Sequence, residues 1–283
     1  MKHPVVLDAC TIINLLRIDE DEFLFRLLCS LRLYVADLVN QEIMKNIFHN
    51  ELSEEQRTYI SGVLPQLQSK WNSFNQTMDL IDTDFYEKNI KKFTRHTKKI
   101  NGELQSSILS LCLSRKYHSR VFFYTDDFPA KEQFKNFFEF QQIGSIGDSV
   151  DLLIFLYWNS PDFSDKKLER FLHDLFAEYN LSVSNFIKGI DEISESYIKK
   201  KNVYKLLREI VDSFYQNEDW LGKVEEVKKK VSSDARLKAL FVSCPEERSC
   251  KLVDKIKEVQ KMMRDFSISL IPQHYYKIFF LST

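Results

Sequence analysis

The first strand-forming segment of the chain is PVVLD, residues 4–8. Residues 4–7 are almost entirely apolar, which is typical of a central strand in a parallel sheet that is covered on both faces. Asp8 ends this run. Ligands bind outside the carboxyl ends of the strands in such a sheet, so the segment indicates both a strand and a functional edge.

Two further runs have the same character, LYVA at residues 33–36 and VFFY at residues 121–124, and residues 140–146 are an expected edge strand. Apolar residues at helical spacing predict helices over residues 38–48, about 53–74, 84–99, from 103 onward, about 130–138 and 149–157. Thr11 is the expected cap of a helix that follows the first strand. Strands that alternate with helices predict an α/β fold, a parallel sandwich over residues 4–157.

The sequence NSPD at residues 159–162 is the expected linker. It would divide a first domain, residues 1–158, from an all-helical C-terminal domain, residues 159–283. Apolar residues at 252, 256, 259, 263 and 266 recur at alternating spacings of four and three. Two heptads fit the core of a helical bundle better than a coiled-coil seam.

The bulk composition limits the classes of partner. The net charge of −1 gives no global positive field, so nucleic acid would need a local basic surface. The cysteines form no C-x-x-C pair, and Cys10, Cys29 and Cys112 lie in apolar runs as expected buried hydrophobic residues. This usage favours a reducing cytoplasm, and the apolar stretch 150–158 is far shorter than a membrane span, which predicts no membrane contact.

Acidic residues stand at the predicted functional edge. Asp8, Asp126 and Asp127 follow strands, while Glu42 and Glu103 lie in the first turns of helices that can reach the same edge. Crowded carboxylates repel one another unless a cation neutralises them. Oxygen donors without accompanying His or Cys favour Mg²⁺ or Mn²⁺, ions that polarise a phosphodiester and activate water. The expected catalytic and metal-binding residues are therefore Asp8, Glu42, Glu103, Asp126 and Asp127.

Four segments resemble the motifs of the PIN-domain nucleases, in the same order: VVLDACTIINLL (5–16), VNQEI (39–43), GELQSSI (102–108) and YTDD (124–127). The resemblance covers residues 4–157 and implies a PIN-like three-layer sandwich with a central parallel sheet. It also implies a Mg²⁺- or Mn²⁺-dependent endonuclease, most often a ribonuclease, with Thr11 and Asn14 lining the site. Many small bacterial members are toxins, and an antiphage effector is a further interpretation. The residues after 158 and the helical insertion around 53–76 depart from those small members.

Each candidate also has a purely structural interpretation. Asp8 and the Asp126–Asp127 pair could be turn or cap residues, Glu42 a solvated helix residue, and Glu103 a partner of its helix dipole. Thr11 and Asn14 are better explained as a cap and a structural polar group than as site residues. The sequence does not separate Asp126 from Asp127, although Asp127 is slightly favoured as the ligand.

A basic stripe precedes Glu103 in the sequence. The helix predicted at 84–99 carries its basic residues at spacings of three and four, which places them on one face: Lys88, Lys91, Lys92, Arg95, Lys98 and Lys99. Such a face could guide the phosphates of a bound strand toward the metal, although a solvated face is the commoner explanation.

Other catalytic classes find no support, since neither a nucleotide-binding P-loop nor a nucleophile elbow is present. The expected partner is nucleic acid, with RNA favoured over DNA. One alternative is a catalytically inactive PIN-like scaffold that binds RNA or a protein. Another is an effector that an inhibitor or regulatory partner holds through the helical domain. A homodimer is also left open.

Overall fold

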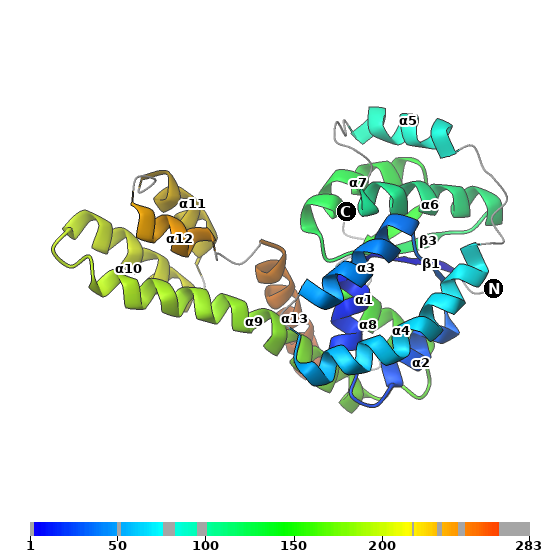
Figure 1. Ribbon diagram of the computed structural model, residues 1–283, viewed down its shortest axis with the longest axis horizontal. Coiled ribbons are helices and arrows are strands. Elements are labelled where there is room, and N and C mark those ends of the chain that lie inside the picture. Colours follow the sequence, from blue (N-terminus) through cyan, green and yellow to red (C-terminus); the bar gives the residue numbers. More distant parts are fainter. Residues whose placement is uncertain are drawn as a thin grey trace. The chain divides into compact units, whose positions relative to one another are not determined.

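The computed structural model describes residues 3–49, 52–75, 83–94, 101–216, 218–230, 234–242 and 247–265. The chain is mostly helical around one small sheet (Figure 1). Of the described residues, none belongs to a helix that is both long enough and apolar enough to cross a membrane.

Among the described residues, four parallel strands form the sheet, in the order β2-β1-β3-β4. Their bounds are β1 (Pro4–Leu7), β2 (Arg32–Tyr34), β3 (Val121–Tyr124) and β4 (Gly144–Gly147). Val5, Val6 and Leu7 are fully buried although alternate side chains point to opposite faces of a strand, so both faces of β1 are covered. The expectation of an α/β fold with a central β1 is therefore confirmed.

The helices described before residue 160 are α1 (Ala9–Arg17), α2 (Phe23–Ser30), α3 (Asp37–His49), α4 (Glu54–Asn75), α5 (Thr83–Thr94), α6 (Gly102–Tyr117), α7 (Phe128–Phe140) and α8 (Ser149–Asn159). Helix α6 packs on β1 and β3, and α8 packs on β3 and β4. Helix α1 contacts α8, whereas α5 lies beside α6 and α7 (Figure 1). Helix α6, which carries Glu103, thus packs on the two central strands, and α3, which carries Glu42, packs on α6.

The last strand begins later than the sequence suggested. Helix α7 continues to Phe140, and β4 begins at Gly144 rather than at residue 140. Gln142 takes a positive φ of 52° and turns the chain, and Gly144 follows with a φ of 153°. A Cβ atom on Gly144 would lie 1.9 Å from the Val121 carbonyl oxygen, so only glycine allows β4 to approach β3 here.

Helix α1 also begins earlier than expected. Its first residue is Ala9 and its N-cap is Asp8, so Thr11 lies inside the first turn and does not cap the helix. The strand predicted at 33–36 is β2, which ends at Tyr34. These shifts leave the order of strands and helices unchanged.

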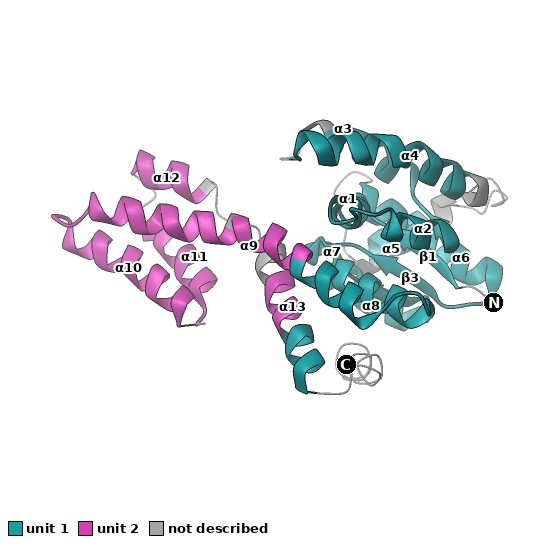
Figure 2. Cartoon of the chain, turned by 90° about the horizontal axis from the view of Figure 1, so that it is seen from below, with its two compact units in different colours: residues 1–173, 258–283 teal, residues 174–257 magenta. Residues whose placement is uncertain are grey.

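The chain forms two compact units, coloured separately in Figure 2. The second unit covers residues 174–257, and the first contains the residues before and after it. The division falls inside α9 (Asp165–Glu195), whereas the sequence suggested a boundary at residues 158 and 159. The segment 159–162 instead joins α8 to α9 within the first unit.

The second unit is all helical over its described residues. It contains part of α9 together with α10 (Lys201–Tyr215), α11 (Trp220–Lys230), α12 (Ala235–Val242) and part of α13 (Glu247–Asp265). Its apolar core includes Phe186, Ile190, Leu207, Val224 and Leu237. Leu252, Ile256 and Val259 of α13 are buried, as a packed helix requires, while Met263 is half-buried and residue 266 lies outside the described residues.

Candidate metal centre

The carboxyl ends of three strands lie side by side. Leu7 pairs with Tyr124, and Tyr124 pairs with Gly147. Two hydrogen bonds extend this register by one residue: the Asp8 amide donates to the Tyr124 carbonyl at 3.0 Å, and the Thr125 amide donates to the Gly147 carbonyl at 2.9 Å. The residues that follow β1, β3 and β4 therefore share one edge of the sheet.

Asp8 is 4% exposed at this edge. Its Oδ2 atom accepts hydrogen bonds from Thr125 Oγ1 at 2.9 Å and from Cys10 Sγ at 3.0 Å. No donor from the described residues reaches its buried Oδ1 atom. Burial raises the pKa of Asp8, and the charge of Asp126 adds to the effect. A buried carboxylate oxygen without a donor is costly, which makes Oδ1 suited to a cation.

Glu42 reaches the edge from the second turn of α3. Its carboxylate accepts a hydrogen bond from the backbone amide of Gly102, the first residue of α6. A Cβ atom on Gly102 would lie 2.8 Å from Glu42 Oε2, so the glycine leaves the space that this carboxylate occupies. Burial raises the pKa of Glu42, with a further contribution from the charge of Asp8.

Glu103 lies in the first turn of α6, a helix whose N-cap Asn101 accepts a hydrogen bond from the Leu104 amide at 3.1 Å. Burial raises the pKa of Glu103 to about 7, and the charges of Asp8, Asp127 and Glu42 add to the effect. We call these four residues, Glu103 with Asp8, Glu42 and Asp127, the Glu103 group. In this group a carboxylate faces three others of like charge.

The two neighbouring aspartates after β3 have different surroundings. Asp126 is buried; its Oδ1 atom accepts from the Ser149 amide at 2.7 Å, and its Oδ2 atom accepts from Ser149 Oγ at 2.6 Å and from Asn14 Nδ2 at 2.7 Å. Asp127 is half-buried, and its Oδ1 atom caps α7 by accepting from the Ala130 amide at 2.8 Å. Both oxygens of Asp126 are thus engaged by the protein, which favours Asp127 as the ligand.

The other two residues predicted to line the site have structural surroundings. Asn14 binds Asp126 and joins α1 to the end of β3. Thr11 is fully buried, and its Oγ1 atom has no hydrogen-bond partner in the described part of the chain. The hydrogen bond of Asn14 is of the kind that its interpretation as a structural polar group predicts.

The Glu103 group is not a preassembled metal site. Within the described residues, no three His, Cys, Asp or Glu side chains lie close enough together to hold a metal ion. Because like charges repel, carboxylates at ligating distance from one another would need a cation to neutralise them. The donorless Asp8 Oδ1 atom and the all-oxygen donor set nevertheless fit a hard divalent cation.

The same edge contains a second set of charged residues, and the sequence did not predict Lys131, Asp148 and Asp151 as part of it. Lys131 of α7 donates to Asp148 Oδ2 at 2.6 Å, and Asp148 follows β4 directly. Asp148 and Asp151 form a capping box at the start of α8. Burial acts to lower the pKa of Lys131, but the charges of Asp148, Asp151 and Asp126 outweigh it and raise this pKa. We call Lys131 and these three aspartates the Lys131 group. The spacing Asp148-x-x-Asp151 before an apolar run was the signal that could have revealed it.

Cys10 does not behave as the expected buried hydrophobic residue. It is half-buried, and its Sγ atom donates to Asp8 and accepts from the Asp126 amide at 3.3 Å. The thiol thus connects the ends of the two central strands. Cys29 is also half-buried, whereas Cys112 is buried as expected.

The predicted basic stripe is described only in part. Lys88 and Lys92 are exposed on α5, while Lys91 is half-buried and pairs with Glu87. Arg95, Lys98 and Lys99 lie outside the described residues. Because α5 packs on α6 and α7, its lysines belong to the same unit as Glu103 and Asp127.

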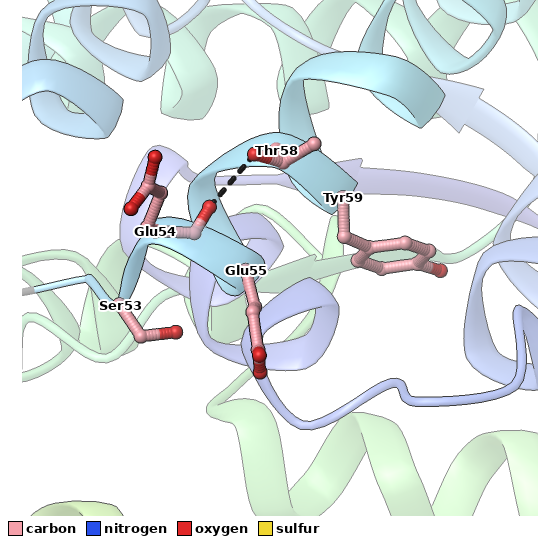
Figure 3. Close-up of a pocket in the computed structure, with 5 residues that line it drawn as sticks. All are labelled: Ser53, Glu54, Glu55, Thr58 and Tyr59. Carbon is pink, nitrogen blue, oxygen red and sulfur yellow. Dashed lines mark hydrogen bonds between the residues drawn. The ribbon is translucent and has the colours of Figure 1, made fainter.

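A surface pocket of about 650 Å³ lies at the start of α4 (Figure 3). Its lining residues are Ser53, Glu54, Glu55, Thr58 and Tyr59, none of which is a predicted site residue. The pocket therefore adds nothing to the candidate metal centre.

Comparisons with protein-family models, with curated proteins and with solved structures found no match to this chain. The functional interpretation consequently depends on the residues at the carboxyl edge of the sheet.

Proposed function

We propose that this protein is a Mg²⁺- or Mn²⁺-dependent endonuclease with a PIN-like fold, and that RNA is its substrate. The observation that carries the proposal is the Glu103 group. Four carboxylates from separate segments converge at the carboxyl edge of the sheet, and one of them buries an oxygen that receives no donor from the described residues. Such an arrangement is unfavourable unless a cation binds there.

Asp8, Glu42, Glu103 and Asp127 would hold the ion. When bound, Mg²⁺ or Mn²⁺ would polarise the phosphodiester and stabilise the charge that develops on it. Thr125 and Cys10 orient Asp8 through its Oδ2 atom and leave Oδ1 for the ion. We expect small side-chain rotations to bring the four carboxylates to ligating distance, because the ion removes their repulsion.

The order of the motifs supports the PIN-like assignment. The four segments that resemble PIN motifs supply Asp8, Glu42, Glu103 and Asp127, in that order along the chain. The acids after β1 and β3 follow central strands of one parallel sheet, where ligands of such sheets bind.

The surface beside the site supports a nucleic-acid substrate. Lys88 and Lys92 are exposed on α5, which packs on α6, the helix of Glu103, and on α7, whose N-cap is Asp127. With a net charge of −1, the protein has to attract a polyanion through a local surface of this kind. Single-stranded RNA is our preferred substrate, and a DNA strand of the same sequence is the comparison.

The experiment is cleavage of labelled RNA and DNA strands in Mn²⁺ by the wild type and by Asp8→Asn. We expect the variant to lose at least about 100-fold in rate, comparable with the loss of one preorganised electrostatic group. The matched control is Asp162→Asn, which changes an exposed aspartate between α8 and α9 and should cleave normally. Circular dichroism checks that both variants are folded. Undiminished cleavage by folded Asp8→Asn would contradict the proposal.

A scaffold that binds RNA or a protein without cleaving is the second candidate. The absence, among the described residues, of three donors at ligating distance favours it. Calorimetric titration with Mn²⁺ separates the two candidates, because a nuclease of this class must bind the ion and a scaffold need not.

A further inference from the structure

Lys131 holds its ammonium group among acids at the carboxyl edge. Its side chain is 23% exposed and that of Asp148 is 3% exposed, so the 2.6 Å contact between them is largely removed from solvent. Asp148 Oδ1 accepts from the Asp151 amide at 3.1 Å, which occupies the other oxygen of the same carboxylate. Asp151 Oδ2 in turn accepts from the Asp148 amide at 2.8 Å.

The third acid of the Lys131 group is equally engaged. Asp126 receives donors from Ser149 and Asn14 on both of its oxygens. The three carboxylates of this group therefore already have protein donors, and a lysine supplies a compact positive charge beside them.

The Glu103 group has no ion-paired cation in the described part of the chain: no described lysine or arginine forms an ion pair with its four carboxylates. The charge of Lys45 acts on Glu42 and lowers its pKa, but burial outweighs this effect. The two groups meet at the neighbours Asp126 and Asp127, which follow the same strand. One edge of the sheet thus contains one set of acids with a built-in cation and one set without.

We propose that Lys131 occupies the position of a second divalent cation, so that the protein binds a single metal ion per chain, in the Glu103 group. The inference rests on the proposed function. Its physical reason is that an ammonium group at Asp148 satisfies the acids that a second ion would need, and it repels an ion that approaches them.

Lys131 would then be a positioning residue and not a catalytic one, because it would confine the metal ion to the Glu103 group by excluding an ion from Asp148. A purely structural ion pair at the same place would stabilise the fold without affecting the number of ions. Counting bound ions is therefore the measurement that separates the two roles.

The test is a count of bound Mn²⁺ by electron paramagnetic resonance and by calorimetric titration, on the wild type and on Lys131→Met. We expect one ion per chain in the wild type and two in the variant. Lys131→Gln, which can still donate a hydrogen bond to Asp148 but carries no charge, is the second variant and should also bind two. Lys131→Arg keeps the charge and should bind one.

The outcomes separate the two proposals. A wild type that binds no Mn²⁺ would overturn the proposed function and this inference together. A wild type that binds two ions would overturn only the inference. The same holds if Lys131→Met or Lys131→Gln is folded, as judged by circular dichroism, and still binds one. Two ions in both uncharged variants, against one in the wild type and in Lys131→Arg, would support it.

Discussion

The Glu103 group and the Lys131 group lie at the same edge of one sheet and consist of the same kind of side chain. In the first, a carboxylate faces three carboxylates; in the second, an ammonium faces three carboxylates. In the first, Asp8 has a buried oxygen that receives no donor from the described residues, whereas in the second the oxygens of Asp126 and Asp148 accept several hydrogen bonds. The comparison teaches that acidic residues at a strand end become ligand candidates only where the protein leaves their charge uncompensated.

Both groups should lose stability as pH rises, but they should do so in different pH ranges. The pKa of Glu103 rises from 4.5 to about 7 on folding, so the native state retains a proton that the unfolded chain releases, and stability falls as pH rises between these values. The pKa of Lys131 is raised above 10.5, so its contribution is fully present at neutral pH and is lost only in strong alkali.

The largest expected effect comes from removing the cation of the Lys131 group. Lys131→Met leaves Asp148 buried without its ammonium partner, and we expect the free energy of unfolding to fall by about 3 kcal/mol. Urea denaturation in the presence of EDTA measures the change. The double variant Lys131→Met with Asp148→Asn should recover most of the loss, because it removes both charges. If the free energy of unfolding of Lys131→Met equals that of the wild type, Lys131 does not neutralise the acids of its group, and the proposed difference between the two groups is wrong.

A smaller effect is expected from narrowing the space in the Glu103 group. Gly102→Ala would place a Cβ atom 2.8 Å from Glu42 Oε2 and displace that carboxylate. We expect Mn²⁺ affinity to fall by about tenfold, as changes beside metal ligands commonly cause. Calorimetry measures the affinity. Gly62→Ala is the matched control, since a Cβ atom on that helical glycine would meet nothing within 4 Å and should leave Mn²⁺ affinity unchanged. Equal affinities in the two variants would contradict the placement of Glu42.

Much of the fold could be predicted from the sequence. The runs around Val5 and Phe122 are continuously apolar, which is characteristic of buried central strands, and the helical spacing between them is clear. The start of β4 could not be predicted, because it depends on the backbone turn at Gln142 and on the close approach of Gly144 to Val121. Both depend on tertiary contacts rather than on local pattern.

The candidate site, like the fold, could be predicted in part from the sequence. Asp8, Glu42 and Glu103 follow from their positions after strands and at helix starts. Asp126 and Asp127 could not be separated, because the difference between them comes from Ser149 and Asn14, which are distant in sequence. The role of Lys131 could not be foreseen either, since a lone lysine on a helix gives no sign of its partner across the sheet edge.

The most direct test of the central claim, that the Glu103 group is a cation site, is the titration of the Glu103 carboxyl by carbon NMR. Its signal would be assigned by comparison with Glu103→Gln. In EDTA we predict a midpoint at about pH 7, and in Mg²⁺ a midpoint at least about one unit lower, because the ion competes with the proton for the carboxylate. A midpoint that is the same in EDTA and in saturating Mg²⁺ would contradict the claim.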